Sequence, residues 1–214
     1  MKRLLLLVTA SIAIMASFAH AQSDTPTLMD IQREWAEINY SMDEQDQPGA
    51  FEALADKTLR ALDRAPRDPA LITWAGIVHS SWAGAKGGLG ALGLAKKARG
   101  YFETAIELDD SVLDGSAHTS LGFLYHKVPG WPIGFGSEKK ARAQLESGLR
   151  YSPDGIDANY FMGVWLMDEK HYAEASVALE RALAAKDRAS RPLADRGRRE
   201  EIRQALRELR ERSQ

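Results

Sequence analysis

The sequence has 214 residues, a formal net charge of −2, 44% hydrophobic residues and no cysteine. This length suits one domain with a substantial hydrophobic core. The near-neutral charge argues against nucleic acid as a partner, because proteins that bind it usually carry a basic face. The absence of cysteine excludes disulfides, thiolate metal sites and cysteine nucleophiles.

The first 21 residues have the pattern of an export signal. Lys2 and Arg3 precede an apolar run over residues 4–18, and Ala19-His20-Ala21 supplies a small-x-small cleavage site. We therefore expect residues 22–214 to be exported to the periplasm; an uncleaved N-terminal anchor is the alternative. No cysteine follows the cleavage site, so no lipid anchor is expected.

The remaining chain shows helical periodicity throughout. Leu28, Ile31, Trp35 and Ile38 follow the spacing of one apolar helix face. No segment alternates at period two for long enough to indicate a strand. The pattern predicts an all-α protein.

Similar segments recur along the chain and indicate helical repeats. Each has a small residue at the same place, and the last two of these, Gly148 and Ala182, lie 34 positions apart. That spacing is the length of a tetratricopeptide repeat (TPR), a helix–turn–helix unit. The sequence therefore predicts a TPR-like α-solenoid within a single domain, residues 22–214. We expect antiparallel helix pairs at about 27–66, 68–110, 115–153 and 157–187, followed by a capping helix at 192–212.

Two of these pairs carry additional residues between their helices. Both insertions coincide with stretches rich in glycine or proline, residues 84–93 and 129–136. In a solenoid, insertions at one repeat position fall on one face, which is often the binding face. We expect the two insertions to border a common cleft.

The second insertion has the most distinctive local sequence. Its prolines restrict the backbone, and its glycines permit geometries that other residues disfavour. Two aromatic residues, Trp131 and Phe135, lie among them. These rings either fold back onto the solenoid as a rigid lip or present an aromatic wall to a ligand. The expected structural residues of the loop are Pro129, Gly130, Pro132, Gly134 and Gly136.

Four further residues are candidate ligand contacts. His79 and Trp82 share an apolar helical stripe, which predicts either core packing or recognition of a polar group. Asn159 and Tyr160 lie in the first turn of a predicted helix, where they could reach the concave surface. An aspartate before that turn, at position 154 or 157, is expected to cap the helix.

Catalytic and cofactor motifs are missing from the sequence. The histidines after the signal are not paired as helical zinc ligands, and no nucleophile elbow, P-loop or dinucleotide fingerprint occurs. We expect no enzyme activity, cofactor or metal. The basic C-terminal helix is either a solvated cap or a docking surface.

Residues 128–136 (VPGWPIGFG), Lys140-Ala141 and residues 152–161 (SPDGIDANYF) resemble the T component of TPR-associated tripartite periplasmic (TRAP) transporters. The resemblance extends over about residues 28–206. It implies an oligomeric periplasmic repeat protein that partners a substrate-binding component and offers a cleft for a small apolar or amphipathic molecule. Family members studied as transporter parts are lipoproteins, a feature that this sequence lacks. The alternative function is a periplasmic protein-interaction scaffold without a small-molecule ligand.

Overall fold

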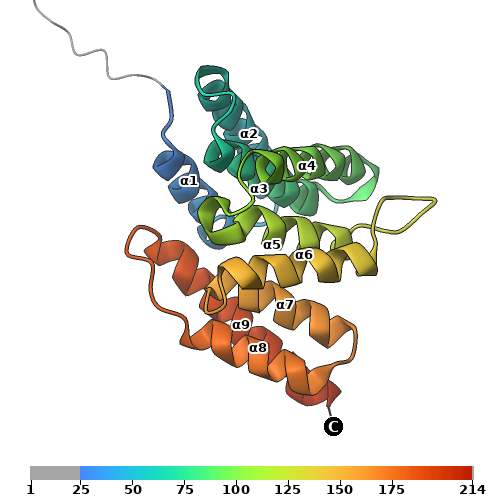
Figure 1. Cartoon of the computed structure of the whole chain (residues 1–214). Coiled ribbons are helices and arrows are strands. Elements are labelled where there is room, and N and C mark those ends of the chain that lie inside the picture. Colours follow the sequence, from blue (N-terminus) through green and yellow to red (C-terminus); the bar gives the residue numbers. More distant parts are fainter. Residues whose placement is uncertain (1–24, 214) are drawn as a thin grey trace, which may run out of the picture.

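The computed structural model describes residues 25–213, so the predicted export signal lies outside the described residues. Within them the chain forms α-helices and no strand (Figure 1), which confirms the all-α prediction. None of the described helices is both long and apolar enough to cross a membrane. The helices are α1 (Leu28–Ser41), α2 (Gln47–Arg64), α3 (Pro69–Lys86), α4 (Gly88–Leu108), α5 (Val112–Lys127), α6 (Glu138–Tyr151), α7 (Ile156–Asp168), α8 (Tyr172–Ala184) and α9 (Pro192–Arg212).

Local sequence chemistry explains where several helices begin. Thr27 and Asp30 form a reciprocal capping box at the start of α1. Asp68 accepts hydrogen bonds from the amides of Ala70 and Leu71 at the start of α3, at 2.8 and 3.2 Å. Short polar side chains therefore satisfy the first free amides of these helices.

Small residues allow the helices of a pair to approach closely. A Cβ atom added to Gly122 of α5 would lie 2.8 Å from the backbone nitrogen of Leu145 in α6. One added to Gly163 of α7 would lie 2.7 Å from Cγ of Leu179 in α8. Glycine is required at both positions because the partner helix occupies the space of a side chain.

The first helices of the pairs form the inner wall of the molecule. Helices α1, α3, α5 and α7 contact one another in succession, and α9 contacts both α7 and α1. Tyr40 near the end of α1 donates a hydrogen bond to Glu201 of α9 at 3.4 Å, and Gly197 of α9 lies against the Tyr40 ring. The five inner helices therefore close into a ring.

The two insertions have different structures. Only Gly87 separates α3 from α4, so the additional residues of the second pair lengthen its helices instead of forming a loop. Gly87 and Gly88 both have a φ of +60°, which glycine adopts at little cost. In the third pair, residues 128–137 form a true loop, and Figure 1 shows it on the same side as the α3–α4 turn.

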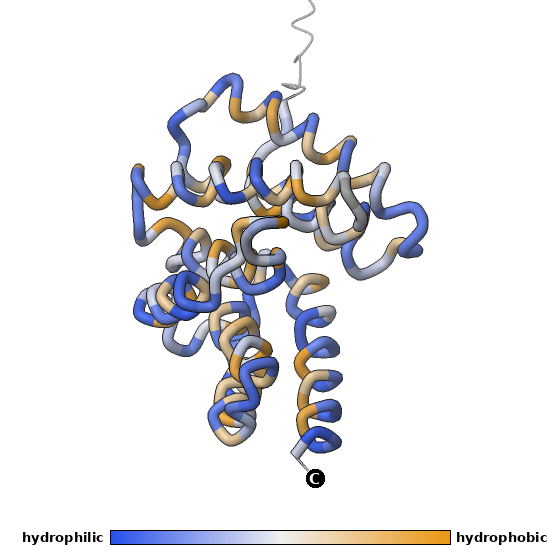
Figure 2. The backbone as a smooth tube through the Cα atoms, turned by 90° about the vertical axis from the view of Figure 1, so that its right-hand side faces the viewer, coloured by the Kyte–Doolittle hydropathy of each residue, from blue (hydrophilic) through white to orange (hydrophobic). Residues whose placement is uncertain are grey.

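The C-terminal helix is more than a solvated cap. Its apolar residues lie along the side turned toward the other helices (Figure 2), with Ala194, Ile202 and Leu209 buried there. The same side also buries Asp195 and Arg198. Charged residues of α9 therefore reach the interior of the ring.

Candidate functional site

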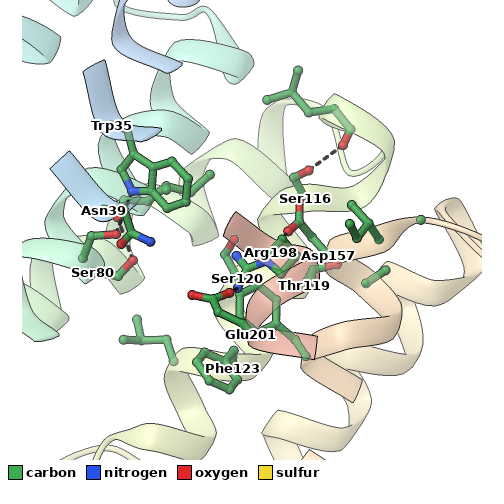
Figure 3. A pocket seen from close by; sticks show the side chains of 18 of the residues that line it. Trp35, Asn39, Ser80, Ser116, Thr119, Ser120, Phe123, Asp157, Arg198 and Glu201 are labelled. Carbon is green, nitrogen blue, oxygen red and sulfur yellow. Dashed lines mark hydrogen bonds and ion pairs between the residues drawn. The ribbon is translucent and has the colours of Figure 1, made fainter. Parts of the chain in front are cut away.

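A cavity of about 1330 Å³ lies inside the ring of inner helices. All five inner helices, the α5–α6 loop and the α8–α9 linker contribute to its wall. Figure 3 shows side chains of α1 and α3 on one side of the space and those of α5, α7 and α9 on the other. The labelled lining residues are Trp35, Asn39, Ser80, Ser116, Thr119, Ser120, Phe123, Asp157, Arg198 and Glu201.

One end of the cavity is built from paired charges. Asp157 of α7 accepts hydrogen bonds from Arg188 at 2.7 Å and from Arg198 at 2.8 Å. Arg198 also pairs with Glu201, and Arg188 pairs with Asp195 at 2.6 Å. These contacts join the α8–α9 linker and α9 to the start of α7.

Burial and ion pairing act against each other at Asp157. Burial alone would raise the pKa of its carboxyl group, but the nearby guanidinium groups of Arg198 and Arg188 outweigh it and lower the pKa. At Glu201 burial dominates and raises the pKa despite the contact with Arg198. Asp157 is therefore held as a carboxylate.

The predicted capping role of an aspartate at α7 is wrong. Gly155 is the N-cap residue, and no side chain makes a capping hydrogen bond there. Asp157 lies in the first turn instead and faces the two arginines. Those arginines follow it by 31 and 41 positions, so helical periodicity around Asp157 gave no indication of them.

The opposite end of the cavity is mainly apolar. Ala91 and Leu92 of α4, Leu124 of α5, and Val128 and Ile133 of the loop line it. These residues surround the ends of α3 and α5, whereas the charged groups surround the start of α7 and the α8–α9 linker. The cavity thus changes from apolar to charged along its length.

Two candidate residues of α3 face α4 and do not line the cavity. His79 is 2% exposed, and its Nδ1–H donates to the carbonyl oxygen of Ala75 at 2.8 Å. Its ring lies 5.1 Å from that of Tyr101, and burial lowers its pKa. Trp82 is half-buried, with the Lys86 ammonium 5.5 Å from its ring. Both side chains serve packing in this structure.

The two candidate residues of α7 also lie outside the cavity lining. Asn159 is 1% exposed, and its side-chain nitrogen donates to the carbonyl oxygens of Pro153 and Gly155 at 2.8 and 2.9 Å. These bonds fix the turn that leads into α7. Tyr160 is half-buried beneath the Arg198 guanidinium, 4.5 Å from its ring centroid.

The aromatic residues of the loop have different environments. Phe135 packs edge-on against Tyr125, with ring centroids 5.9 Å apart, and Arg99 lies 4.6 Å above its ring. Trp131 is 89% exposed and contributes no side chain to the cavity. The rigid-lip interpretation therefore describes Phe135, whereas Trp131 neither folds back nor lines the cavity.

The backbone of the loop is tightly organised. The Gly136 amide donates to Pro129 at 3.0 Å, and the Ser137 amide donates to Tyr125 at 3.0 Å. A Cβ atom on Gly134 or Gly136 would collide with a carbonyl oxygen of residues 128–129, where the loop begins. The Trp131–Pro132 peptide bond is cis, and Pro129 borders the cavity. Gly130 accepts two amide hydrogen bonds that close the tip, from Ile133 at 3.2 Å and Gly134 at 3.0 Å.

Sequence reasoning missed the residues that give the cavity its charge. Arg198 lies in the helix that the sequence marked only as basic, and Arg188 and Arg191 lie just before it. The spacing of these three arginines could have indicated that they lie on one face of the chain. It could not have indicated what that face contacts, because the contacting residues belong to α3 and α7. Within residues 25–213, no cluster of three or more histidine, aspartate or glutamate side chains is arranged to hold a metal ion.

Comparison with known proteins supports the fold. No family model matches the sequence, and no curated protein matches it. Among solved structures, the chain is similar to a thermophilic TPR protein of Thermus thermophilus, with a TM-score of 0.56 and 23% sequence identity. The similarity covers 75% of this chain and 73% of that one. It confirms the predicted TPR-like α-solenoid and, at this identity, concerns the fold alone.

Proposed function

We propose that this protein is a non-enzymatic binding protein that encloses an extended amphipathic ligand in its central cavity. The observation that carries the proposal is a cavity of about 1330 Å³ inside the ring, apolar at one end and charged at the other. Ligand sites for small molecules commonly measure about 300–1,000 Å³. The space therefore suits a ligand with an elongated apolar body.

The absence of an activated nucleophile among the lining residues favours binding over catalysis. Asp157 and Glu201 are paired with arginines, so these carboxylates are engaged by fixed cations. Two of the serines that line the cavity bond within their own helices: Ser80 donates to Ile77 at 2.9 Å, and Ser116 to Leu113 at 2.6 Å. A third, Ser81, accepts a hydrogen bond from the Trp35 indole at 2.9 Å. These contacts support a structural role for the polar groups.

The likeness to the TRAP T component gives this binding role a context. Segments that carry the likeness contribute Pro129, Ile133 and Pro153 to the cavity wall. On our proposal, the exported protein works in the periplasm, associates with copies of itself, and receives or passes its ligand to a substrate-binding component. Transporter genes beside the gene for this protein would support that context.

Native mass spectrometry of gently purified protein tests the binding role. We expect a small amphiphile to co-purify with the wild type. In Ser120→Trp, an indole placed in the cavity wall should displace it. Ala143→Trp is the matched control, because Ala143 is exposed on α6 and does not line the cavity. Equal ligand content in both variants would contradict the proposal.

A second candidate function is a protein-interaction scaffold, and the α5–α6 loop favours it. Trp131 and Ile133 are 89% and 72% exposed on a backbone held by internal hydrogen bonds. Rigidly presented aromatic residues are frequent anchors of protein interfaces. A Trp131→Ala/Ile133→Ala variant should lose a partner that Val177→Ala retains, since Val177 is 58% exposed on α8. Retention by the loop variant would exclude this loop as the interface.

A further inference from the structure

The charged end of the cavity contains one arginine that lacks the pairing of its neighbours. Arg191 lies at the start of α9, and its guanidinium carbon lies 5.0 Å from the centroid of the buried Trp74 ring. Its buried Nε–H has no hydrogen-bond partner among the described residues. Arg188 and Arg198, by contrast, each bind two carboxylates.

The carboxylates nearest to Arg191 are already engaged. Asp157 binds Arg188 and Arg198, and Asp195 binds Arg188 through the side chain and the backbone amide. Burial, together with the adjacent Arg188, lowers the pKa of the Arg191 guanidinium. Arg191 has no ion pair of its own among the described residues and shares the attraction of Asp157 and Asp195 with two other arginines, so an anion bound here would supply the direct partner that it lacks.

Exposed charges of the cavity lining do not fill this role. Arg181 and Lys186 line the cavity, as do Asp114 and Asp154, and all four are exposed. Lys127 also lines it, is exposed, and pairs with Asp168 at 2.9 Å. Two cations and two anions in contact with water largely cancel and are screened by salt. Arg191 is therefore the partly buried lining cation that has no direct carboxylate partner among the described residues.

A mainly apolar path leads away from Arg191. From Trp74 the wall continues along α3 through Ile77 and Ala83 to Gly84, and Ser80 and Ser81 add two hydroxyl groups to it. Ten residues of helix correspond to about 15 Å at the helical rise per residue. The wall opposite includes Phe123 and Leu124 of α5 and ends near Ile133.

We infer that Arg191 forms an anion subsite that receives the carboxylate of a long-chain monocarboxylate, whose alkyl chain lies along the apolar path. A guanidinium suits this head group because its N–H donors match the two carboxylate oxygens. Its contact with the Trp74 ring, 5.0 Å from the guanidinium carbon to the ring centroid, holds the guanidinium at this end of the cavity. This inference rests on the proposed binding function and adds the chemical class of the ligand.

Calorimetric titration of the delipidated full-length protein tests the inference with three probes of equal chain length: dodecanoate, dodecanol and dodecylamine. We expect dodecanoate to bind at least about tenfold more tightly than dodecanol, as a hydrogen bond to a charged group allows, and dodecylamine to bind most weakly. In Arg191→Met the affinity for dodecanoate should fall to that for dodecanol, with the dodecanol affinity unchanged.

Arg196→Met is the matched control, because Arg196 lies exposed on the same helix and does not line the cavity. It should retain the preference for dodecanoate. Thermal unfolding verifies that both variants are folded, and Arg191→Lys gives a second measurement that keeps the charge but loses the planar fork. Equal affinity of the wild type for dodecanoate and dodecanol would overturn the anion subsite and leave the binding function intact. No binding of any probe to the wild type would overturn both.

Discussion

Individual side chains determine how this protein buries charged groups among its apolar helices. Asp157 connects two arginines from a distant part of the chain, at 2.7 and 2.8 Å. Arg198 in turn lies over the rings of Tyr160 and Phe161, 4.5 and 4.7 Å from their centroids. Carboxylate and aromatic groups together make the burial of this guanidinium tolerable.

Replacing Asp157 with asparagine should destabilise the protein by about 3 kcal/mol, because removal of one partner leaves two guanidinium groups without their shared anion. Urea unfolding followed by circular dichroism measures this change. Asp154→Asn is the matched control in the same turn, since Asp154 is exposed. A cost of less than about 1 kcal/mol for Asp157→Asn would show that the network adds little to stability.

The same residue should make stability depend on acid pH. The ordinary aspartate value is 3.8, and the folded protein lowers the pKa of Asp157 below it. The carboxylate therefore stabilises the fold fully above pH 3.8 and loses this contribution as pH falls through the lower folded-state value. Urea midpoints measured from pH 7 down to pH 2 should fall less steeply for Asp157→Asn than for the wild type.

At the scale of elements, close helix pairing explains the distribution of small residues. Gly122 faces both the side chain and the backbone of Leu145, whereas a methyl group added to Gly100 of α4 would have no atom within 4 Å. The two glycines therefore have opposite roles although both lie within helices.

Alanine substitution at these glycines should change stability in opposite directions. Gly122→Ala should cost about 1–3 kcal/mol, because the new methyl group forces α5 and α6 apart. Gly100→Ala should stabilise by about 1 kcal/mol, because alanine favours the helix and nothing obstructs it. Denaturant unfolding of both variants gives the comparison, and a stabilised Gly122→Ala would contradict the close approach.

The α5–α6 loop separates structural from exposed aromatic residues. Phe135→Ala should destabilise the protein by about 2 kcal/mol, less than for a fully buried ring, since it removes the contacts with Tyr125 and Arg99. Trp131→Ala should change the free energy of unfolding by no more than about 0.5 kcal/mol, since the indole is 89% exposed. Thermal and urea unfolding check both values; equal costs would mean that Trp131 also packs on the body in solution.

At the scale of the whole molecule, contact between α9 and α1 turns a curved solenoid into a closed ring. Gly197 allows this contact, because a Cβ atom there would overlap the Tyr40 ring. The hydrogen bond from Tyr40 to Glu201 spans 161 positions of sequence. The cavity owes its continuous wall to this closure.

Gly197→Ala should therefore loosen the ring. We expect a loss of about 1–3 kcal/mol in stability and faster amide hydrogen exchange in α1, with exchange in α5 and α6 unchanged. Gly49→Ala is the control, since no atom lies within 4 Å of its added methyl group. Unchanged exchange in α1 would show that the α1–α9 contact does not hold the ring closed.

Local patterns of residues were enough to predict the helical class, the order of the helix pairs and the loop after α5. These features follow from signals that are local in sequence: the spacing of apolar residues, the glycine- and proline-rich stretches, and the small residues that recur in each repeat. Such interactions depend on neighbours in sequence, so a pattern of residues is enough to predict them.

The ring, the cavity and the residues that line it emerged only once the helices were assembled in three dimensions. The four helix pairs place α9 beside α1 through the sum of their small rotations, which no local pattern records. Asp157 meets Arg198, and Trp74 meets Arg191, because distant segments arrive at one end of that ring. For the same reason, the aromatic and polar residues that stood out in sequence, such as His79 and Asn159, lie in packing positions, while the charged residues of the last helix reach the interior.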